Sequence, residues 1–247
     1  MKLSFIIPAH NEEAYLDKCL SSVVNASKNC NYETEIIVVN NASTDNTKRV
    51  AQMFEGVKIV DEPKKGLVQA RQTGFLASKG DLIANIDADT ILPENWIFKV
   101  FDEFQKDDSL VALSGPFVYY DLSKMTNTLV KTFFYFGSLS NFLNQKVFKN
   151  GAVLQGGNFI IRKNALEKIN GYNLDLTFFG EDIDIAKRIS RVGKVKFTSK
   201  LPIYTSGRRL KAEGVIMTGI RASFDYLWIT IKGEPFRKGK KQKDIRN

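Results

Sequence analysis

Histidine and cysteine are scarce in this sequence of 247 residues, which contains one histidine and two cysteines. Cys19 and Cys30 lack CxxC spacing and have no histidine cluster near them, so the sequence predicts neither a zinc site nor a disulfide framework. A reducing cytoplasm is therefore the simplest compartment. The single histidine, His10, has no serine or cysteine signature around it, which favours a polar residue at a strand end over a catalytic one.

Long hydrophobic runs are also missing. The longest uncharged segment, residues 132–145, is shorter than the roughly 20 apolar residues that a spanning helix needs, and it contains serine and asparagine. The apolar N-terminal stretch, residues 1–8, is too short for the core of a signal peptide and has no small-residue cleavage site. We expect neither a transmembrane helix nor a signal peptide, and we interpret residues 1–8 as a first strand.

Glycine-rich phosphate loops are absent as well, because neither a GxGxxG nor a GxxxxGK(S/T) pattern occurs. A nucleotide bound to this protein would have its phosphates held by a metal ion and by side chains. The net charge is +9, of which residues 232–247 contribute +5, from seven basic and two acidic residues. This basic tail indicates either a solvated extension or contact with anionic lipid, and without a nucleic-acid motif we expect no nucleic acid as a partner.

The first half of the chain alternates short β-rich runs with helical patterns. Such alternation predicts an α/β fold in which right-handed crossovers build a mostly parallel, Rossmann-like sheet flanked by helices. The 43% hydrophobic fraction is that of a globular protein. We expect strands at 3–7, 35–40, 57–60, 82–86 and 110–114, and helices at 12–26 and 45–54.

The second half is less regular and predicts a mixed arrangement. We expect an aromatic-rich helical stretch at 124–148, a loop at 151–157, a strand at 158–162, a short helix from Asn164, and a helix from the segment 178–182 to about Val192. No internal repeat or low-complexity linker is present, so we predict one domain over residues 1–247. Its expected parts are a nucleotide-binding half at 1–116, an acceptor half at 117–231 and the basic tail at 232–247.

A final helix is predicted at 212–231, because apolar residues that include Trp228 recur there at helical spacing. Together with the basic tail, this helix fits peripheral contact with the inner face of the cytoplasmic membrane. The aromatic run at 133–136 fits a lipid-linked acceptor. Packing in the core explains both features nearly as well.

Asp87 and Asp89 come directly after the buried strand predicted at 82–86, and ligands of such sheets bind beyond the carboxyl ends of the strands. Two carboxylates there, pointing in different directions, suit a hard divalent cation. Mg²⁺ or Mn²⁺ takes one or two protein carboxylates and fills its other positions with water and phosphate oxygens. The alternative is that the aspartates only cap the turn before Pro93.

Several segments, in this order along the chain, resemble glycosyltransferase family 2, whose members are inverting enzymes with the GT-A fold. The matching segments are residues 6–13 (IIPAHNEE), residues 38–45 (VVNNASTD), residues 66–74 with Arg71, the metal motif Asp87-Ala88-Asp89, and the acidic pair Glu181-Asp182. The resemblance covers nearly the whole chain.

The resemblance implies a nucleotide-sugar donor and a divalent cation, Mg²⁺ or Mn²⁺, held by Asp89. Asp87 would contact the ribose and Asn41 would face the base. The family commonly has aspartate at the position of Asn41, and we expect uridine ahead of guanosine. The donor-site residues that the resemblance implies are Pro8, Ala9, Asn11, Glu13, Asn41, Arg71, Asp87 and Ala88. We add Arg208 and Arg209, which follow Gly207 and present fork-shaped donors suited to phosphate. The alternative is that these two arginines form a solvated pair.

The resemblance also implies that Asp182, beside Glu181, is the general base that deprotonates the acceptor hydroxyl. A place at a helix start would favour its ionised form through the helix dipole. On sequence alone, acids in the first turn of a helix are the alternative. Gly156, Gly157 and Asn158 resemble the family segment where small residues let a sugar lie close to the backbone.

We therefore expect an inverting glycosyltransferase, of hexosyl or N-acetylhexosaminyl groups, that acts in cell-envelope glycan or glycolipid synthesis. The donor would be a UDP-sugar, with a GDP-sugar next, and the acceptor a carbohydrate or lipid-linked hydroxyl. One alternative is a sugar nucleotidyltransferase, whose glycine-rich N-terminal loop is missing here. The other is a non-catalytic protein that binds nucleotide-sugars or acts as a membrane adaptor, and the presence of Asp182 argues against it.

Overall fold

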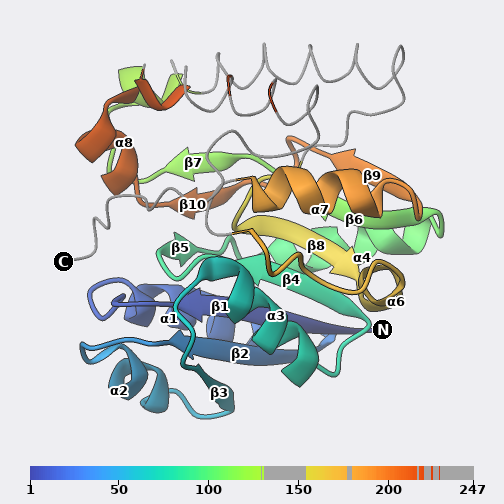
Figure 1. Cartoon of the computed structure of the whole chain (residues 1–247), viewed down its shortest axis with the longest axis horizontal. Coiled ribbons are helices and arrows are strands. Elements are labelled where there is room, and N and C mark those ends of the chain that lie inside the picture. The colour runs from blue at the N-terminus through green and yellow to red at the C-terminus, as the bar shows by residue number, and fades with distance from the viewer. Residues whose placement is uncertain are drawn as a thin grey trace.

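The computed structural model describes residues 1–128, 130, 154–176, 180–215, 217–219, 224 and 228 (Figure 1). In this part of the chain, seven strands form one sheet in the order β3-β2-β1-β4-β8-β6-β9. Their bounds are β1 Lys2–Ala9, β2 Glu33–Asn41, β3 Val57–Glu62, β4 Leu82–Ile86, β6 Leu110–Ser114, β8 Asn158–Arg162 and β9 Lys194–Phe197.

The sheet is mostly parallel. Strands β1 to β4 all run in one direction, and β9 is parallel to β6, whereas β8 is antiparallel to both β4 and β6. The chain passes outward from β1 to β2 and β3, then crosses back to form β4 on the other side of β1. A topological switch point therefore lies between β1 and β4, which is where open α/β sheets bind ligands. The predicted α/β class, with a mixed second half, is confirmed.

Helices cover both faces of the sheet. Their bounds are α1 Leu16–Lys28, α2 Thr47–Gln52, α3 Leu67–Ala77, α4 Trp96–Lys106, α6 Lys163–Lys168, α7 Glu181–Ile189 and α8 Arg208–Glu213. Because side chains alternate along a strand, Phe5 packs on one face of β1 with the core of α1 and α4, where it lies 5.9 Å from the ring of Trp96. Ile6 packs on the other face with α3, α6 and α7.

A second sheet links distant segments of the chain. In the described residues it has three strands, β5 (Thr90–Ile91), β7 (Phe117–Tyr119) and β10 (Ile203–Thr205), in the order β5-β10-β7. Thr205 pairs with Thr90 directly after the Asp87-Ala88-Asp89 segment. The small sheet thus carries α8, which follows β10, to the carboxyl end of β4 (Figure 1).

Several predicted elements have the predicted bounds. Strands β4, β6 and β8 begin and end at the predicted residues. Helix α1, however, begins at Leu16 and not at Glu12, because Glu12 to Tyr15 form a turn in which the Glu12 carbonyl accepts hydrogen bonds from the Tyr15 and Leu16 amides. Helix α2 is likewise shorter than predicted.

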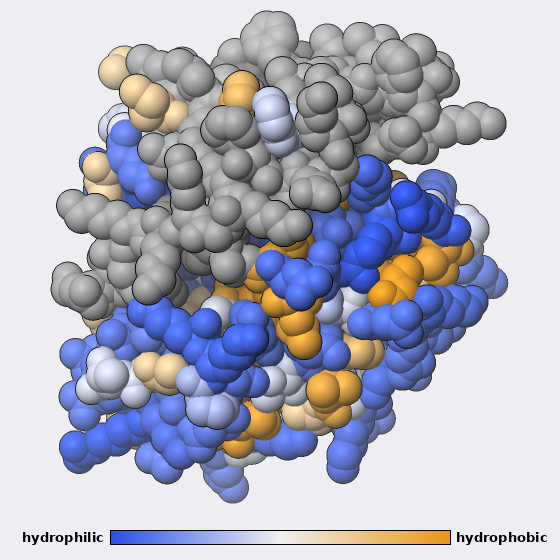
Figure 2. Space-filling model, viewed as in Figure 1, coloured by the Kyte–Doolittle hydropathy of each residue, from blue (hydrophilic) through white to orange (hydrophobic). Residues whose placement is uncertain are grey.

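Other predictions concern regions at the edge of the description. The aromatic run at 133–136, most of the predicted helix at 212–231 and the basic tail lie outside the described residues. The seven-stranded sheet contains β6, which precedes residue 116, and β8 and β9, which follow it, so one sheet extends across the two predicted halves. The single domain stays a prediction. Among the described helices, none has the length and apolar character needed to cross a bilayer. Figure 2 shows polar residues over most of the described surface on this face, with apolar residues in separate groups.

Candidate functional site

The turns that follow β1 and β2 are tied together at the carboxyl edge of the sheet. Asn11 has a φ of 51°, a left-handed conformation that asparagine tolerates, and its Oδ1 accepts a hydrogen bond from the Thr44 amide at 2.9 Å. Ser43 Oγ accepts from the Asn11 amide at 3.3 Å. Glu13 Oε2 accepts from the amide and the side chain of Asn46, at 2.8 and 2.9 Å. Asn11 and Glu13 therefore build the rim of the switch point, beside Pro8 and Ala9 at the end of β1.

Asn41 holds a neighbouring segment of the chain. Its Nδ2 donates to the carbonyls of Glu62 and Lys64 at 3.1 and 2.8 Å, and its Oδ1 accepts from the Gly66 amide at 2.8 Å. An aspartate could not donate the first two bonds, which explains why an amide stands at this position. This buried side chain shapes the 62–66 segment, and its contact with a base stays a prediction.

The Asp87-Ala88-Asp89 segment forms a turn, closed by a hydrogen bond of 3.1 Å from the Thr90 amide to the Asp87 carbonyl. The turn directs the two carboxylates to different partners. Asp87 Oδ1 lies 3.4 Å from Arg71 Nη2, whereas Asp89 accepts from Thr205 Oγ1 at 3.2 Å and faces Arg208. The side chain of Ala88 is buried in the core between them.

Arg71 connects the two acidic parts of the site. It is 1% exposed, and its Nη1 lies 2.7 Å from Glu181 Oε1 while its Nη2 faces Asp87. The guanidinium also stacks over the ring of Phe159, at 5.1 Å from the centroid. The charges of Glu181 and Asp87 raise the pKa of Arg71 above its ordinary value against the effect of burial. Arg71 is thus a buried cross-link between the Asp87 turn and helix α7.

Glu181 and Asp182 open helix α7. Burial, followed by the charge of Glu181, raises the pKa of Asp182 to about 7, against the opposing effects of Arg71 and of the Ile183 amide, which donates to Asp182 Oδ1 at 2.9 Å. Although Asp182 stands at the start of a helix, burial favours its neutral form. A carboxylate with a pKa near neutrality is suited to accept a proton.

The Gly156-Gly157 turn lies between Asp87 and Asp182. A Cβ on Gly157, whose φ is 80°, would lie 2.1 Å from Asp87 Oδ2, and a Cβ on Gly156 would lie 3.4 Å from Asp182 Oδ2. Both glycines therefore let the chain approach the two carboxylates closely. The side chain of Asn158 is fully buried and donates to the Leu201 carbonyl at 3.0 Å; its contact with a sugar stays a prediction.

Replacement of Gly157 by alanine is expected to weaken nucleotide binding about tenfold, through loss of the Asp87 position. Left-handed backbone alone costs alanine about 1–2 kcal/mol, so Gly56→Ala is the matched control: Gly56 has a φ of 78° and nothing within 4 Å of its Cβ position. Urea unfolding should show a loss of stability in both variants. Titration with UDP and GDP should show weaker binding for Gly157→Ala alone, and equal binding by the two variants would contradict the proposed contact.

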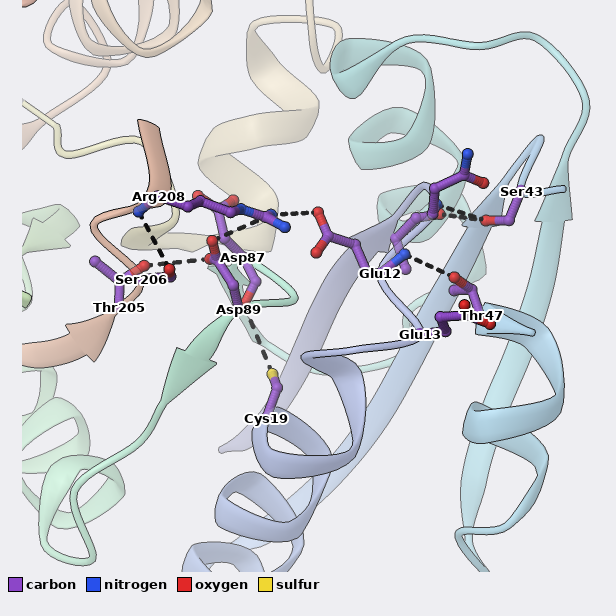
Figure 3. Close-up of polar contacts among 12 residues, drawn as sticks. Glu12, Glu13, Cys19, Ser43, Thr47, Asp87, Asp89, Thr205, Ser206 and Arg208 are labelled. Carbon is purple, nitrogen blue, oxygen red and sulfur yellow. Dashed lines mark hydrogen bonds and ion pairs between the residues drawn. The ribbon is translucent and has the colours of Figure 1, made fainter. Parts of the chain in front are cut away.

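Asp89 and Arg208 form the other side of the site. Burial and the charge of Asp87 raise the pKa of Asp89 to about 6, although Arg208 and Thr205 oppose the rise. Arg208 Nη2 lies 3.2 Å from Asp89 Oδ2 and 2.5 Å from Glu12 Oε1 (Figure 3). Arg209 lies near Tyr119, where its charge opposes the burial that raises the pKa of that phenol to about 12.

Glu12 is the site residue that sequence reasoning missed. The motif at residues 6–13 contains Asn11, Glu12 and Glu13 in succession, and nothing in their order shows which side chain points inward. Only the partner Arg208, 196 residues later, identifies Glu12.

The balance of charge in the site fits a divalent cation. Among the described residues, five carboxylates lie here beside the guanidinium groups of Arg71 and Arg208; they belong to Glu12, Asp87, Asp89, Glu181 and Asp182. Within the described residues, no group of three or more histidine, cysteine or acidic side chains could hold a metal by itself. Mg²⁺ or Mn²⁺ at Asp89 would accordingly need oxygen ligands from a phosphate or water.

Comparison with known proteins identifies the family of the chain. The model of the family "Glycosyl transferase family 2" matches residues 4–170, and that of the "N-terminal domain of galactosyltransferase" matches residues 138–208. A probable glycosyltransferase of Bacillus subtilis, YdaM, is 29% identical over 207 residues, which are 78% of this chain and 47% of that protein. The chain thus spans less than half of this relative.

Solved structures are similar over most of the chain. Glucosyl-3-phosphoglycerate synthase from Mycobacterium tuberculosis, in complex with Mn²⁺, UDP-glucose and phosphoglyceric acid, has a TM-score of 0.61 at 19% identity, over 96% of this chain and 81% of that one. The mannosyltransferase PcManGT from Pyrobaculum calidifontis, in complex with GDP-Man and Mn²⁺, has a TM-score of 0.62 at 18% identity, over 90% and 64% of the two chains. These likenesses confirm the predicted GT-A fold.

Proposed function

The chain belongs to glycosyl transferase family 2, and on that premise we propose that it transfers a sugar from a nucleoside diphosphate to a hydroxyl acceptor, with inversion at the anomeric carbon. The observation that carries the proposal is the position of Arg71. Its guanidinium contacts Asp87 on the donor side and Glu181, next to Asp182, on the acid–base side. The buried guanidinium of Arg71 thereby joins the donor side of the site to its acid–base side.

On the donor side, the rim formed by Pro8, Ala9, Asn11 and Glu13 would border the nucleotide, and Asp87 would accept a hydrogen bond from a ribose hydroxyl. Asp89 would hold the divalent cation, and Arg208 would face the diphosphate with a second positive charge. Arg209, expected to assist there, would act at longer range. A bound cation supplies Lewis-acid stabilisation of the leaving diphosphate.

On the acceptor side, Asp182 would take the proton of the acceptor hydroxyl as that oxygen bonds to the anomeric carbon. The bond from this carbon to the phosphate oxygen breaks in the same displacement, and the nucleoside diphosphate leaves with its electron pair. The attack comes from the face opposite the leaving group and so inverts the configuration. Gly156 and Gly157, beside Asp182 and Asp87, would let the sugar lie against the backbone.

For the donor we propose a UDP-sugar first and a GDP-sugar next, carrying a hexosyl or N-acetylhexosaminyl group. Structural neighbours bind UDP-glucose and GDP-Man with Mn²⁺, which supports both nucleotides. For the acceptor we propose a carbohydrate or lipid-linked hydroxyl in cell-envelope glycan or glycolipid synthesis. The proposed contact with the inner face of the membrane involves the C-terminal helix and basic tail.

A thermal-shift screen with Mn²⁺ and UDP-, GDP- and dTDP-sugars tests the donor proposal. A nucleotide at a hundredfold excess over its Kd adds about 2.7 kcal/mol to the free energy of unfolding, which raises Tm by roughly 5–10 °C in a chain of this size. We expect that shift with one nucleotide class, and a smaller one when EDTA replaces Mn²⁺. No shift with any of the three would contradict the donor proposal, and release of pyrophosphate from a nucleoside triphosphate and a sugar phosphate would favour a nucleotidyltransferase.

A further inference from the structure

Glu12 is held rigidly in the turn after β1. Its amide donates to Thr47 Oγ1 at 2.7 Å, and its carbonyl accepts from the amides of Tyr15 and Leu16. The side chain is 5% exposed and points toward the Asp87-Ala88-Asp89 turn (Figure 3). An acidic side chain so deeply buried needs a cationic partner, because desolvation of an unpaired carboxylate is costly.

That partner arrives from the other end of the sequence. Arg208 stands at the start of α8, in a segment of residues 203–213 that we name the C-terminal arm. Its Nη2 donates a hydrogen bond to Glu12 Oε1 at 2.5 Å and forms an ion pair with Asp89 Oδ2 at 3.2 Å. The guanidinium lies over the ring of Tyr15, 4.5 Å from the centroid. Glu12 and Asp89 thus share Nη2 of Arg208, while the Tyr15 ring lies against the guanidinium.

The arm itself is anchored separately. Asp121 Oδ1 accepts from the Gly207 amide at 2.5 Å, and Asp121 Oδ2 accepts from Ser206 Oγ at 3.0 Å and from Lys211 Nζ at 3.1 Å. These bonds hold the backbone next to Arg208 but not its side chain. The direction of the guanidinium therefore depends on Glu12, Tyr15 and Asp89.

A divalent cation at Asp89 changes this balance. A bound cation and Arg208 would both contact the Asp89 carboxylate, and their like charges would repel each other. The contact between Arg208 and Asp89 would therefore weaken when the cation binds. Glu12 contacts the same Nη2 atom as Asp89 but belongs to the turn after β1. It is the carboxylate that can retain Arg208 near the diphosphate once Asp89 has become a metal ligand.

We propose that Glu12 is a positioning residue for Arg208: it keeps the guanidinium directed at the donor diphosphate while Asp89 exchanges the arginine for the metal ion. This inference rests on the proposed function, since it takes the ligand to be a nucleoside diphosphate with a divalent cation. It also explains how a residue of the C-terminal arm is aligned with turns formed by the first 90 residues of the chain.

Calorimetric titration of Glu12→Gln, which preserves shape and removes the charge, tests this role. The probes are UDP with Mn²⁺, and UMP, replaced by GDP and GMP if the donor screen selects guanosine. We expect Glu12→Gln to bind the diphosphate about tenfold more weakly and the monophosphate as the parent chain does, because Arg208 serves the diphosphate. Glu103→Gln is the matched control, since Glu103 pairs with Lys196 away from the site and should bind both probes normally.

A double-mutant cycle separates positioning from a general loss of structure. If Glu12 acts through Arg208, adding Glu12→Gln to Arg208→Gln should cause no further loss of affinity. The inference would be overturned if the double variant bound the diphosphate more weakly than Arg208→Gln alone. It would also be overturned if Glu12→Gln bound both probes equally more weakly, or bound both as the parent chain does. Failure of the parent chain to bind any diphosphate would instead overturn the proposed function. If Glu12→Gln does not fold, Glu12→Asp, with its shorter reach, should show a smaller loss for the diphosphate alone.

Discussion

Replacement of Asp182 by asparagine is expected to lower kcat for sugar transfer about 10²–10⁴-fold, with nearly unchanged affinity for the nucleoside diphosphate. An amide of the same shape cannot take the acceptor proton, whereas the donor contacts of Asp87 and Asp89 stay in place. Initial rates and a parallel nucleotide titration measure the two quantities. Asp184→Asn is the control on the same helix, because Asp184 pairs with Arg188 and not with the site. Full activity of Asp182→Asn would remove Asp182 from the role of base.

The rate of sugar transfer by the parent chain should depend on pH through the same residue, Asp182. The pKa of Asp182 is raised from 3.8 to about 7, so the base is protonated at low pH and the rate should rise with pH up to about 7.

A raised pKa also means that the folded chain binds this proton more tightly than the unfolded chain does, and the Asp182 contribution to stability falls as pH rises from about 4 to 7. Asp182→Asn should therefore lose less stability than the parent chain over that range. Unfolding curves at pH 5 and 8 measure the difference.

Replacement of Asp89 by alanine is expected to remove the metal-dependent part of donor binding and to lower kcat/KM about 10³-fold. The physical reason is that Asp89 is the proposed metal ligand of the chain, and a cation at the diphosphate stabilises the leaving group by several kcal/mol. In thermal-shift titrations with UDP or GDP, Mn²⁺ should add nothing to the Tm of this variant.

Asp87→Asn provides the contrast for that experiment. Asp87 would contact the ribose, so its loss should weaken nucleotide binding to a similar degree with and without Mn²⁺. Arg71 and Gly157 adjoin Asp87, so substitutions of these two residues should also weaken nucleotide binding to a similar degree with and without Mn²⁺. If Asp89→Ala retained its full response to Mn²⁺, or if Asp87→Asn lost only that response, the proposed division between metal and ribose contacts would be wrong.

The strands of the fold were predictable because burial leaves a direct trace in the sequence. Leu82–Ile86, Leu110–Ser114 and Asn158–Arg162 are short apolar runs between polar turns, and each forms a strand with the predicted bounds. The segments 6–13 and 38–45, with Asp87-Ala88-Asp89 and Glu181-Asp182, were likewise visible as motifs. Their order along the chain was enough to indicate the family, which the comparisons then showed.

The contacts inside the site had no such trace. Helix α1 begins four residues later than expected because Glu12 is held in a turn by Thr47, from a different element. Asn41 faces the 62–66 segment, and the pKa of Asp182 follows from burial that no local pattern records.

By itself, then, the sequence determined the α/β class, the order of the motifs along the chain and the identity of their acidic residues. Periodicity and turn chemistry are local properties, and they can be recognised one segment at a time. Only the tertiary structure decided which charges meet. Arg71 joins Asp87 to Glu181, and Arg208 joins Asp89 to Glu12, because five separate segments converge at the switch point between β1 and β4. The energy of such pairs depends on distance and burial in space, which separation along the chain does not specify.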